Sequence, residues 1–377
     1  MNNKQLSILQ MCYDSNELIS LMRNLKHDSI SSIFLVPYYS LFCIESLCTL
    51  KNYGIDISSD YNCPYNQKTI RAKLKCFEEK YIKSINIVRN CDFIQDYIFK
   101  NKLKCTLLNE HNMYYNIGIF IYNNKIIGNS QYAYYIFQDS KFLKKQNLLL
   151  NDFQFNLIPG ELKEYGAYCG NIISKINTIT TEVFKLESNF VNNYLKPNIF
   201  FKDLNTNKMF KDETKLEHLY LLHILSNINY VYYILKKYEK NNGWWIKLYY
   251  ITYYYSLRRI INLTEYLRKN NKKLDKIEIL ENLYNSTNKY INSNFRNCVM
   301  HYDFSNYINK KHYDINKPLF GLIESSFNGI NYNNFKNEIL TFIKEISDTL
   351  EKYLSIDISN YKLLIKGDEN TNERWCT

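Results

Sequence analysis

Hydrophobic residues recur at helical spacing over most of the 377-residue chain. In the first half this pattern predicts helices over residues 4–24, 37–53, 67–101 and 161–195, of which the third is long and basic. Pro37 is expected in the first turn of the second helix and Gly54 at its end, because proline suits a first helical turn and glycine a terminus. Pro159 and Gly160 are expected to interrupt the chain before the fourth helix.

The segment "NIGIFIYNNKIIGN" has a different character. Runs of β-forming residues flank Asn123 and Asn124, and asparagine tolerates the positive φ of a tight hairpin turn. We therefore predict a β-hairpin here, followed by mixed strand and loop over residues 132–158, where the apolar residues have no regular period. This short β segment, near residues 115–158, lies in an otherwise mostly helical N-terminal domain, residues 1–200.

The second half of the chain begins with a predicted domain boundary at residues 196–213, "KPNIFFKDLNTNKMFKDE", which combines proline with polar turn formers. Thr214 and Glu217 then form a capping-box pattern. Helices are expected over residues 214–239, 244–268, 274–290 and 335–354. The last carries an apolar stripe of Phe335, Ile339, Phe342, Ile343, Ile346, Leu350 and Leu354.

Each of these helices must bury its apolar stripe against another helix. Residues 213–355 are therefore predicted to form a four-helix bundle, and residues 356–377 a C-terminal tail. The expected fold class is mainly α, with an α+β N-terminal domain that contains a small hairpin and precedes the bundle.

Composition adds a basic balance and an excess of tyrosine. The formal charge of +11 comes mostly from lysine and favours polyanionic partners, because a bound phosphate backbone releases its counterions. Lysine suits non-specific attraction better than the bidentate contacts that read bases. The 36 tyrosines and the many asparagines also fit the codon usage of an AT-rich genome, so composition alone does not identify a nucleic-acid-binding protein.

Cysteine usage and hydropathy bear on the compartment. The ten cysteines include no CxxC pair and no Cys/His grouping at zinc-finger spacing, which predicts free thiols in a reducing cytosol. The N-terminus lacks the basic and apolar regions of a signal peptide. The most apolar run, "SIFLVPYYSLFCIESLCTL", contains Pro37 and Glu45, so no membrane span is predicted. We therefore expect a cytoplasmic protein with no membrane partner.

The segment "FRNCVMHYDF", residues 295–304, holds the clearest candidate chemistry. Asn297 and His301 are four residues apart and share a helical face, whereas Arg296 and His301 are roughly 140° apart on an ideal helix. A distorted turn, or two copies facing each other in a dimer, would bring arginine and histidine to one cleft. Histidine moves protons near neutral pH, and arginine stabilises the extra negative charge of a phosphorane. With Asn297 positioning them, these groups suit metal-independent RNA cleavage, in which a 2′-hydroxyl attacks the adjacent phosphate.

The motif Arg296-Asn297-Cys298-Val299-Met300-His301 resembles that of the HEPN superfamily, helical-bundle proteins whose ribonuclease members carry Arg-x4-6-His, often with Asn, Asp or His after the arginine. The resemblance covers at most residues 213–355. It implies a HEPN-like four-helix bundle and a homodimer in which two motifs form one composite site. It also implies a toxin or abortive-infection effector of antiviral defence, with an antitoxin or another regulatory partner.

The motif is uncommon by chance. Eight arginines and six histidines give an expectation of about 0.1 for one Arg-x4-His, and the added asparagine lowers it further. The other "RN" pairs in the first half, at Arg23 and Arg89, have no histidine at the required spacing. One toxin branch of the family carries a tyrosine two residues after the histidine as a target of nucleotide modification. Here that position is Asp303, which argues against this regulation, and Tyr302 is instead a candidate for contact with the substrate.

Further candidates lie outside the motif. Arg258 and Arg259 end the aromatic run "YYITYYYSLRR", which would either stack bases or form buried bundle core with a polar edge. His218 and His223 are five residues apart, and with Glu217 they invite a metal site. Without a third ligand at a matching spacing they are interpreted as ordinary helix histidines, so neither a metal nor another cofactor is expected.

Two hypotheses for the function follow. The first is an endoribonuclease whose partner is RNA, with Arg296 stabilising phosphate charge and His301 transferring protons. The second is a non-catalytic helical protein, such as an adaptor, a nucleic-acid-binding subunit or a small-molecule sensor, because the long N-terminal region carries no catalytic motif. A groove open at Arg296 and His301 would favour the first hypothesis, and burial of both in a closed core the second.

Overall fold

The computed structural model describes residues 2–25, 29–57, 80–102, 116–132, 157–184, 197–304, 307–359 and 362–363. Most of these residues are helical, which confirms the mainly α fold class. The helices are α1 (Asn3–Leu25), α2 (Ser29–Asn52), α4 (Tyr81–Lys102), α8 (Leu157–Phe184), α9 (Thr206–Met209), α10 (Lys215–Asn229), α11 (Gly243–Lys269), α12 (Ile277–Thr287), α13 (Ser293–His301), α14 (Leu322–Ser326) and α15 (Tyr332–Leu354). The strands are β1 (Ile117–Tyr122), β2 (Lys125–Asn129), β3 (Phe200–Leu204) and β4 (Lys362–Leu363).

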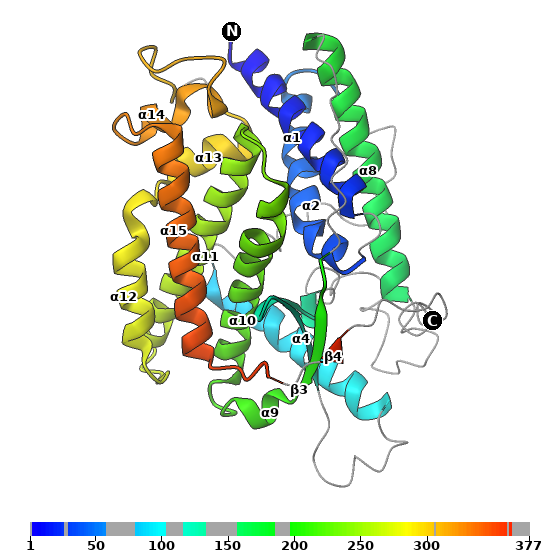
Figure 1. Ribbon diagram of the computed structural model, residues 1–377, viewed down its shortest axis with the longest axis vertical. Coiled ribbons are helices and arrows are strands. Elements are labelled where there is room, and N and C mark those ends of the chain that lie inside the picture. The colour runs from blue at the N-terminus through cyan, green and yellow to red at the C-terminus, as the bar shows by residue number, and fades with distance from the viewer. Residues whose placement is uncertain are drawn as a thin grey trace.

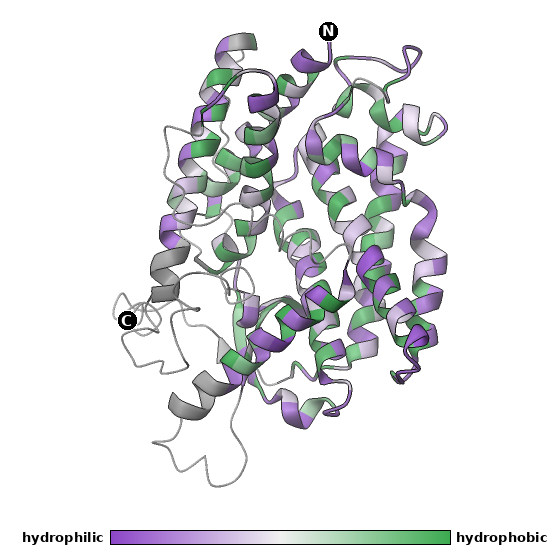
Figure 2. Cartoon of the chain, turned by 180° about the vertical axis from the view of Figure 1, so that it is seen from behind, coloured by the Kyte–Doolittle hydropathy of each residue, from purple (hydrophilic) through white to green (hydrophobic). Residues whose placement is uncertain are grey.

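The long helices form two groups that run roughly side by side (Figure 1). One group contains α1, α2 and α8, and the other contains α10, α11, α12 and α15, whose members pack against one another. The sheet and α4 lie at one end of the molecule, while α13 and α14 lie at the opposite end. Hydrophobic and hydrophilic positions alternate along the helices, as expected when each helix buries one face (Figure 2).

The antiparallel sheet has the strand order β2-β1-β3-β4. Asn123 and Asn124 form the turn between β1 and β2 with φ angles of 47° and 57°, so the predicted hairpin is confirmed. The sheet is fastened to the helices by Lys125, whose ammonium group lies 2.6 Å from the carboxylate of Glu351 on α15. Asn229 on α10 reinforces this link by donating to the backbone oxygen of Ile126 at 3.0 Å.

The two halves of the chain share one hydrophobic core. Residues 196–213 were predicted to separate two domains, but Phe200–Leu204 within this stretch is β3, which pairs with β1 of the N-terminal region. Helix α1 also packs against α11, and α2 against α13. The buried residues form one continuous cluster from Leu6 to Leu354. The polar residues of the stretch therefore mark a sheet edge and short helix and not a linker between cores.

Helices α2 and α8 begin earlier in the chain than the positions of Pro37 and Pro159 led us to predict. Helix α2 begins at Ser29, so Pro37 lies in its interior, because burying Phe34, Leu35 and Val36 outweighs the hydrogen bond that proline cannot make. Helix α8 begins at Leu157 and takes Pro159 into its first turn, where a backbone N–H has no helical partner in any case.

The length of α2 bears on the prediction that no segment of the chain spans a membrane. Over Ile30–Asn52 it is long and apolar enough to cross a membrane by length and composition alone, although 72% of its most apolar window is buried inside the protein. Its Glu45 side chain is buried as well. These contacts are those of a core helix, and the absence of a membrane partner stays a prediction.

Tyrosine side chains explain why the motif has a helix of its own. The sequence placed the motif at the end of the helix over residues 274–290, but α12 ends at Thr287 and α13 begins at Ser293. Between them the Tyr250 hydroxyl lies 3.0 Å and 2.9 Å from the backbone oxygens of Tyr290 and Asn292. These contacts satisfy backbone groups that a continuous helix would pair internally.

Other helix limits follow tertiary contacts. The prediction of a capping box was wrong. Thr214 makes no side-chain cap bond, and Glu217 accepts a hydrogen bond from Tyr81 at 3.2 Å. The predicted helices over residues 4–24 and 335–354 are confirmed as α1 and α15, and the stripe on α15 is buried except for the half-buried Phe342. Residues 364–377 of the predicted tail lie outside the described residues.

His223 joins α10 to the hairpin from within the core. Its Nε2 lies 3.2 Å from Gln131 Oε1, and its Nδ1 lies 3.4 Å from Asn129 Nδ2. Burial, with a smaller contribution from the nearby Arg259 charge, lowers the pKa of His223 to about 3. The folded state therefore holds a neutral imidazole that the unfolded chain protonates below about pH 6.5.

This difference predicts a specific loss of stability in acid. Between about pH 6.5 and pH 3 the unfolded chain binds a proton at His223 that the folded protein does not, so stability falls as the pH is lowered. The His223 contribution is about 1.4 kcal/mol for each pH unit. Urea unfolding from pH 7 to pH 4 should show a shallower loss for His223→Gln than for the parent. Equal slopes in the two proteins would contradict the prediction.

Candidate active site around helix α13

Helix α13 presents one buried and one exposed face. Asn292 caps its start by accepting a hydrogen bond from the Phe295 backbone N–H at 3.0 Å. The buried face consists of Phe295, Cys298, Val299 and Met300, whereas Asn297 on the opposite face is exposed. The helix ends where Tyr302 takes a left-handed conformation, with φ 56°. Two of the three predicted catalytic residues therefore share a face that reaches solvent, Asn297 and the partly exposed His301.

His301 is paired with a carboxylate from the N-terminal region. Its Nδ1 lies 2.6 Å from Glu45 Oε2 on α2. The Glu45 side chain is 3% exposed and the His301 side chain 31% exposed, so the carboxylate is shielded while the imidazole reaches solvent. Where the carboxylate accepts this hydrogen bond, the hydrogen is on Nδ1, and Nε2 is left for other chemistry. Thr49 fixes the helix end as well, through a bond to the His301 backbone oxygen at 3.2 Å.

Arg296 has different neighbours. Its guanidinium carbon lies 5.5 Å and 5.9 Å from the ring centres of Tyr254 and Tyr255 on α11, within the range of a cation–π interaction. The side chain is half-buried. Helix α13 is regular from Ser293 to His301, so no distorted turn directs Arg296 and His301 to one point. A cleft formed from both groups would use the dimer arrangement expected from the sequence.

The other predicted contact residues are less accessible. Arg258 is half-buried, but Arg259 is 5% exposed and lies over the Tyr220 ring at 5.3 Å. In the aromatic run before them, Tyr249, Tyr250, Tyr253 and Tyr254 are buried. The run is therefore bundle core with a polar edge, and the prediction that Arg259 contacts substrate was wrong because the core covers it.

Tyr302 is also buried, with no exposed surface. Its hydroxyl donates to Asp14 Oδ2 at 2.7 Å, and Lys247 bonds to the same oxygen at 2.7 Å while lying 3.9 Å from the centre of the Tyr302 ring. Burial, together with the Asp14 charge, holds the pKa of Tyr302 well above its usual value. The prediction that Tyr302 contacts substrate was therefore wrong, and the residue connects α13 to α1 and α11.

Asp303 bonds to Asn3, and Glu45 is the carboxylate that contacts the candidate catalytic histidine. Asp303 is exposed, and its Oδ1 accepts a hydrogen bond from the Asn3 side chain at 3.3 Å. Burial of the Cys298 thiol, and to a smaller extent the nearby Asp303 charge, raises the pKa of Cys298 to about 12. Asp303 is thus an exposed carboxylate just after the end of α13, and Glu45 has the orienting position.

Sequence reasoning missed Glu45 because 256 positions separate it from His301. The nearest signal was a charged residue within the most apolar run of the chain, which was used only to argue against a membrane span. A buried ionisable group inside such a run indicates a polar partner. Here the partner is the candidate catalytic histidine.

The two histidines once considered as metal ligands have other roles. His218 lies stacked between the Phe210 and Tyr353 rings, and His223 is buried between the hairpin side chains described above. Within the part of the chain that the structure describes, no three His, Cys, Asp or Glu side chains gather closely enough to hold a metal ion. The interpretation of both as ordinary helix histidines fits these contacts.

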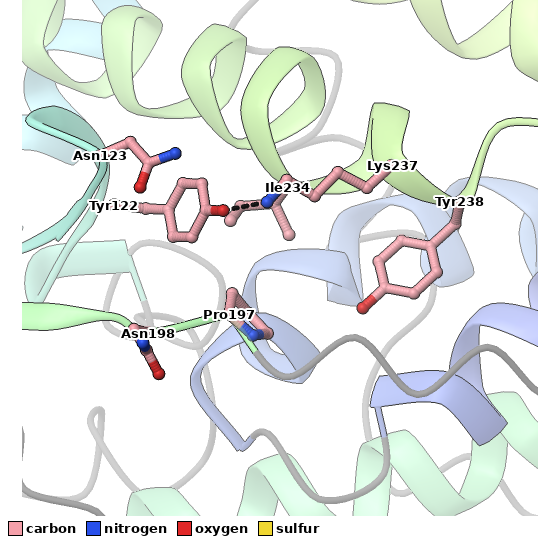
Figure 3. A pocket seen from close by; sticks show the side chains of 7 residues that line it. All are labelled: Tyr122, Asn123, Pro197, Asn198, Ile234, Lys237 and Tyr238. Carbon is pink, nitrogen blue, oxygen red and sulfur yellow. Dashed lines mark hydrogen bonds between the residues drawn. The ribbon is translucent and has the colours of Figure 1, made fainter.

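A cavity of about 260 Å³ lies beside the hairpin turn. Figure 3 shows Tyr122 and Asn123 on one side of it and Lys237 and Tyr238 on the other. The Lys237 ammonium group bonds to the Tyr122 hydroxyl and lies 4.1 Å from the ring centre. The cavity contains no residue of α13, so it is separate from the candidate active site.

Comparisons of this chain with protein-family models, with curated proteins and with solved structures found no match.

The burial of Tyr302 gives a first testable prediction for this region. Tyr302→Phe removes one of the hydrogen bonds that hold the buried Asp14 carboxylate, and should lower the free energy of unfolding by about 1–2 kcal/mol. RNA binding and cleavage should not change, because the hydroxyl does not reach solvent. Urea unfolding and RNA cleavage would be measured together, with Tyr284→Phe, at a half-buried tyrosine of α12, as the control. Loss of cleavage at unchanged stability would mean that Tyr302 acts on the substrate.

Proposed function

We propose that this protein is a metal-independent endoribonuclease of HEPN type, with Arg296, Asn297 and His301 as its catalytic residues. The observation that carries the proposal is the pair of His301 and Glu45, in which a buried carboxylate holds one ring nitrogen of a partly exposed imidazole. Catalytic histidines are commonly fixed in one tautomer by such a carboxylate. The partial exposure of His301 and Arg296 also differs from the closed core expected of an inactive bundle.

The proposed reaction uses one base and one acid. A base removes the proton of a ribose 2′-hydroxyl, whose oxygen bonds to the adjacent phosphorus. The bond from phosphorus to the 5′-oxygen breaks, and an acid protonates that oxygen. The products are a 2′,3′-cyclic phosphate and a 5′-hydroxyl. An imidazole nitrogen can act as the base or as the acid in such a transfer, and His301 Nε2 is proposed for one of these roles.

A homodimer belongs to this proposal because each chain contributes only one candidate catalytic histidine. Glu45 occupies Nδ1, so each chain contributes one ring nitrogen, while the reaction uses a base and an acid. A second copy, with its α13 facing the first across the scissile phosphate, supplies the other. The exposed Asn297 on the same face is placed to orient a phosphate or a ribose hydroxyl between the two copies.

Arg296 is suited to the charge of the transition state. The rings of Tyr254 and Tyr255 hold its guanidinium group, and the side chain as a whole is half-buried. A guanidinium group that is already positioned can stabilise the extra negative charge on the phosphorane without reorganising. The packing of α10, α11, α12 and α15 against one another is consistent with the four-helix bundle of this class.

The wider setting belongs to the same proposal. Many HEPN ribonucleases act as toxins or abortive-infection effectors, and we propose this role for the chain, in the cytoplasm and under control of an antitoxin or another regulatory partner. Asp303 stands where one toxin branch has its modified tyrosine, so control by a binding partner fits this chain better than nucleotide modification.

A non-catalytic helical interaction protein is the alternative. The specific observation in its favour is that Glu45 and Thr49 both bind His301, so the same contacts would fasten α13 to α2 in a purely structural role. In that case removal of His301 would lower stability and change no activity. The two functions therefore predict different results for the same variants.

Cleavage assays with single variants test the proposal. Arg296→Ala and His301→Ala should each lower the cleavage rate of single-stranded RNA by about 100-fold or more, because each removes a group that acts in the transition state. Arg89→Ala, from an exposed "RN" pair on α4, and His218→Ala, whose ring stacks on those of Phe210 and Tyr353, are matched controls and should cleave like the parent. Identical cleavage by the parent and by His301→Ala, or none by the parent on any RNA, would refute the proposal.

Glu45 gives a second test because it acts through His301. Glu45→Gln keeps an acceptor for Nδ1 but removes the charge that stabilises the imidazolium ion, so kcat should fall about tenfold while KM changes little. Glu45→Ala should lose more, because the ring is then free to rotate. The exposed Glu265→Gln is the control. An unchanged kcat for both Glu45 variants, measured on protein of confirmed fold, would remove Glu45 from the mechanism.

A further inference from the structure

The loop that follows α13, residues 307–317, holds exposed aromatic and basic side chains. Among the described tyrosines only Tyr307 and Tyr313 are exposed, at 37% and 38% of their surface. Lys310 and Lys311, which lie between them, are exposed too. The two exposed tyrosines therefore lie in one short loop, at the same end of the molecule as helix α13 (Figure 1).

Backbone contacts hold this loop in one conformation. Asn309 accepts from the Lys311 backbone N–H at 3.0 Å through its side chain, and from the backbone N–H groups of His312 and Tyr313 through its carbonyl oxygen. Its own N–H donates to Ser325 on α14 at 3.0 Å. The exposed rings are therefore presented by a fixed turn, and less conformational entropy is lost when a ligand orders them.

Close packing against Gly321 supports the far side of the loop. Gly321 has φ +88° and faces the His312 carbonyl so closely that a Cβ atom would overlap it. Asp314 N–H donates to the Phe320 oxygen at 3.3 Å, and the Phe320 ring contacts that of Phe304 at 5.5 Å. Phe304 follows α13 directly, so the loop is fixed to the same end of the molecule as His301 (Figure 1).

The charge of the loop matches a phosphate backbone. Lys310 and Lys311 form no ion pair with any described residue, whereas Lys317 lies 3.6 Å from Glu324. The loop thus offers two adjacent ammonium groups between two aromatic rings. Proteins that bind single-stranded nucleic acid combine the same groups, with rings that stack on bases and lysines that follow the phosphates.

We propose that residues 307–317 bind single-stranded RNA, with Tyr307 and Tyr313 stacking on bases and Lys310 and Lys311 contacting phosphates. This inference rests on the proposed function and deepens it, since it assigns the substrate as unpaired RNA that crosses the loop before it reaches His301. Duplex RNA is a poor ligand because its bases are already stacked on one another.

Binding measurements in a His301→Ala background separate this inference from catalysis. Fluorescence anisotropy with labelled single-stranded RNA should show affinity about tenfold or more lower for Tyr307→Ala and for Tyr313→Ala, and little changed for the Tyr→Phe variants, which keep the rings. Phe93→Ala, an exposed aromatic residue on α4, is the control and should bind like the parent. Equal affinity of the parent and the Tyr→Ala variants, or equal affinity for duplex and single strand, would overturn the proposal.

The lysines are tested by the salt dependence of binding. Replacing both Lys310 and Lys311 by alanine should lower the slope of log affinity against log salt by about 1.4, since each phosphate contact on a single strand contributes about 0.7. The matched control is the double alanine variant of Lys272 and Lys273, which are exposed at the turn between α11 and α12. An unchanged slope in the loop variant would contradict the phosphate contacts.

Failure of this inference is distinct from failure of the proposed function. If the loop variants lose RNA affinity and the parent never cleaves, the loop assignment stands and the nuclease falls. If cleavage depends on His301 while the loop variants bind and cleave like the parent, the nuclease stands and the loop assignment falls.

Discussion

The buried carboxylate of Asp14 is the constraint on which the candidate site depends. It is fully enclosed, and it accepts hydrogen bonds from Gln10 on its own helix, from Lys247 on α11 and from Tyr302 at the end of α13. A buried charge is tolerated only when such partners surround it, and removing one partner of a buried ion pair commonly costs about 3–5 kcal/mol. The group therefore fixes α13 against both helical groups.

This fixation determines which side chains the motif can present. With Tyr302 held inside and the left-handed residue ending the helix, His301 is directed toward α2, where Glu45 meets it, and Asn297 is left at the surface. Arg296 faces α11 instead, across Tyr254 and Tyr255. The N-terminal helices thus form part of the candidate site. Their removal would leave His301 without its carboxylate and Tyr302 without Asp14, so a shortened chain of residues 213–355 lacks the groups that orient the motif.

The sequence predicted what local pattern determines. The helices α1 and α15, the Asn123-Asn124 hairpin and the exposed face shared by Asn297 and His301 follow from periodicity and turn preference. Features set by contacts between distant segments could not be predicted. The Tyr250 hydroxyl binds the backbone between α12 and α13. Strand β3, which lies in the predicted domain boundary, pairs with β1. Glu45 contacts His301 although 256 positions separate them. The burial of Arg259 and Tyr302 was missed for the same reason, since composition does not show which face of a tyrosine-rich helix is covered.

We propose that an imidazole oriented by Glu45 takes part in RNA cleavage by internal attack of the 2′-hydroxyl. The most direct test is to identify the ends of RNA fragments made by the purified protein in the presence of EDTA. We expect fragments with 2′,3′-cyclic phosphate and 5′-hydroxyl ends, and no such fragments with His301→Ala. Fragments with 5′-phosphate ends, cleavage that EDTA abolishes, or the same fragments from His301→Ala would contradict this proposal.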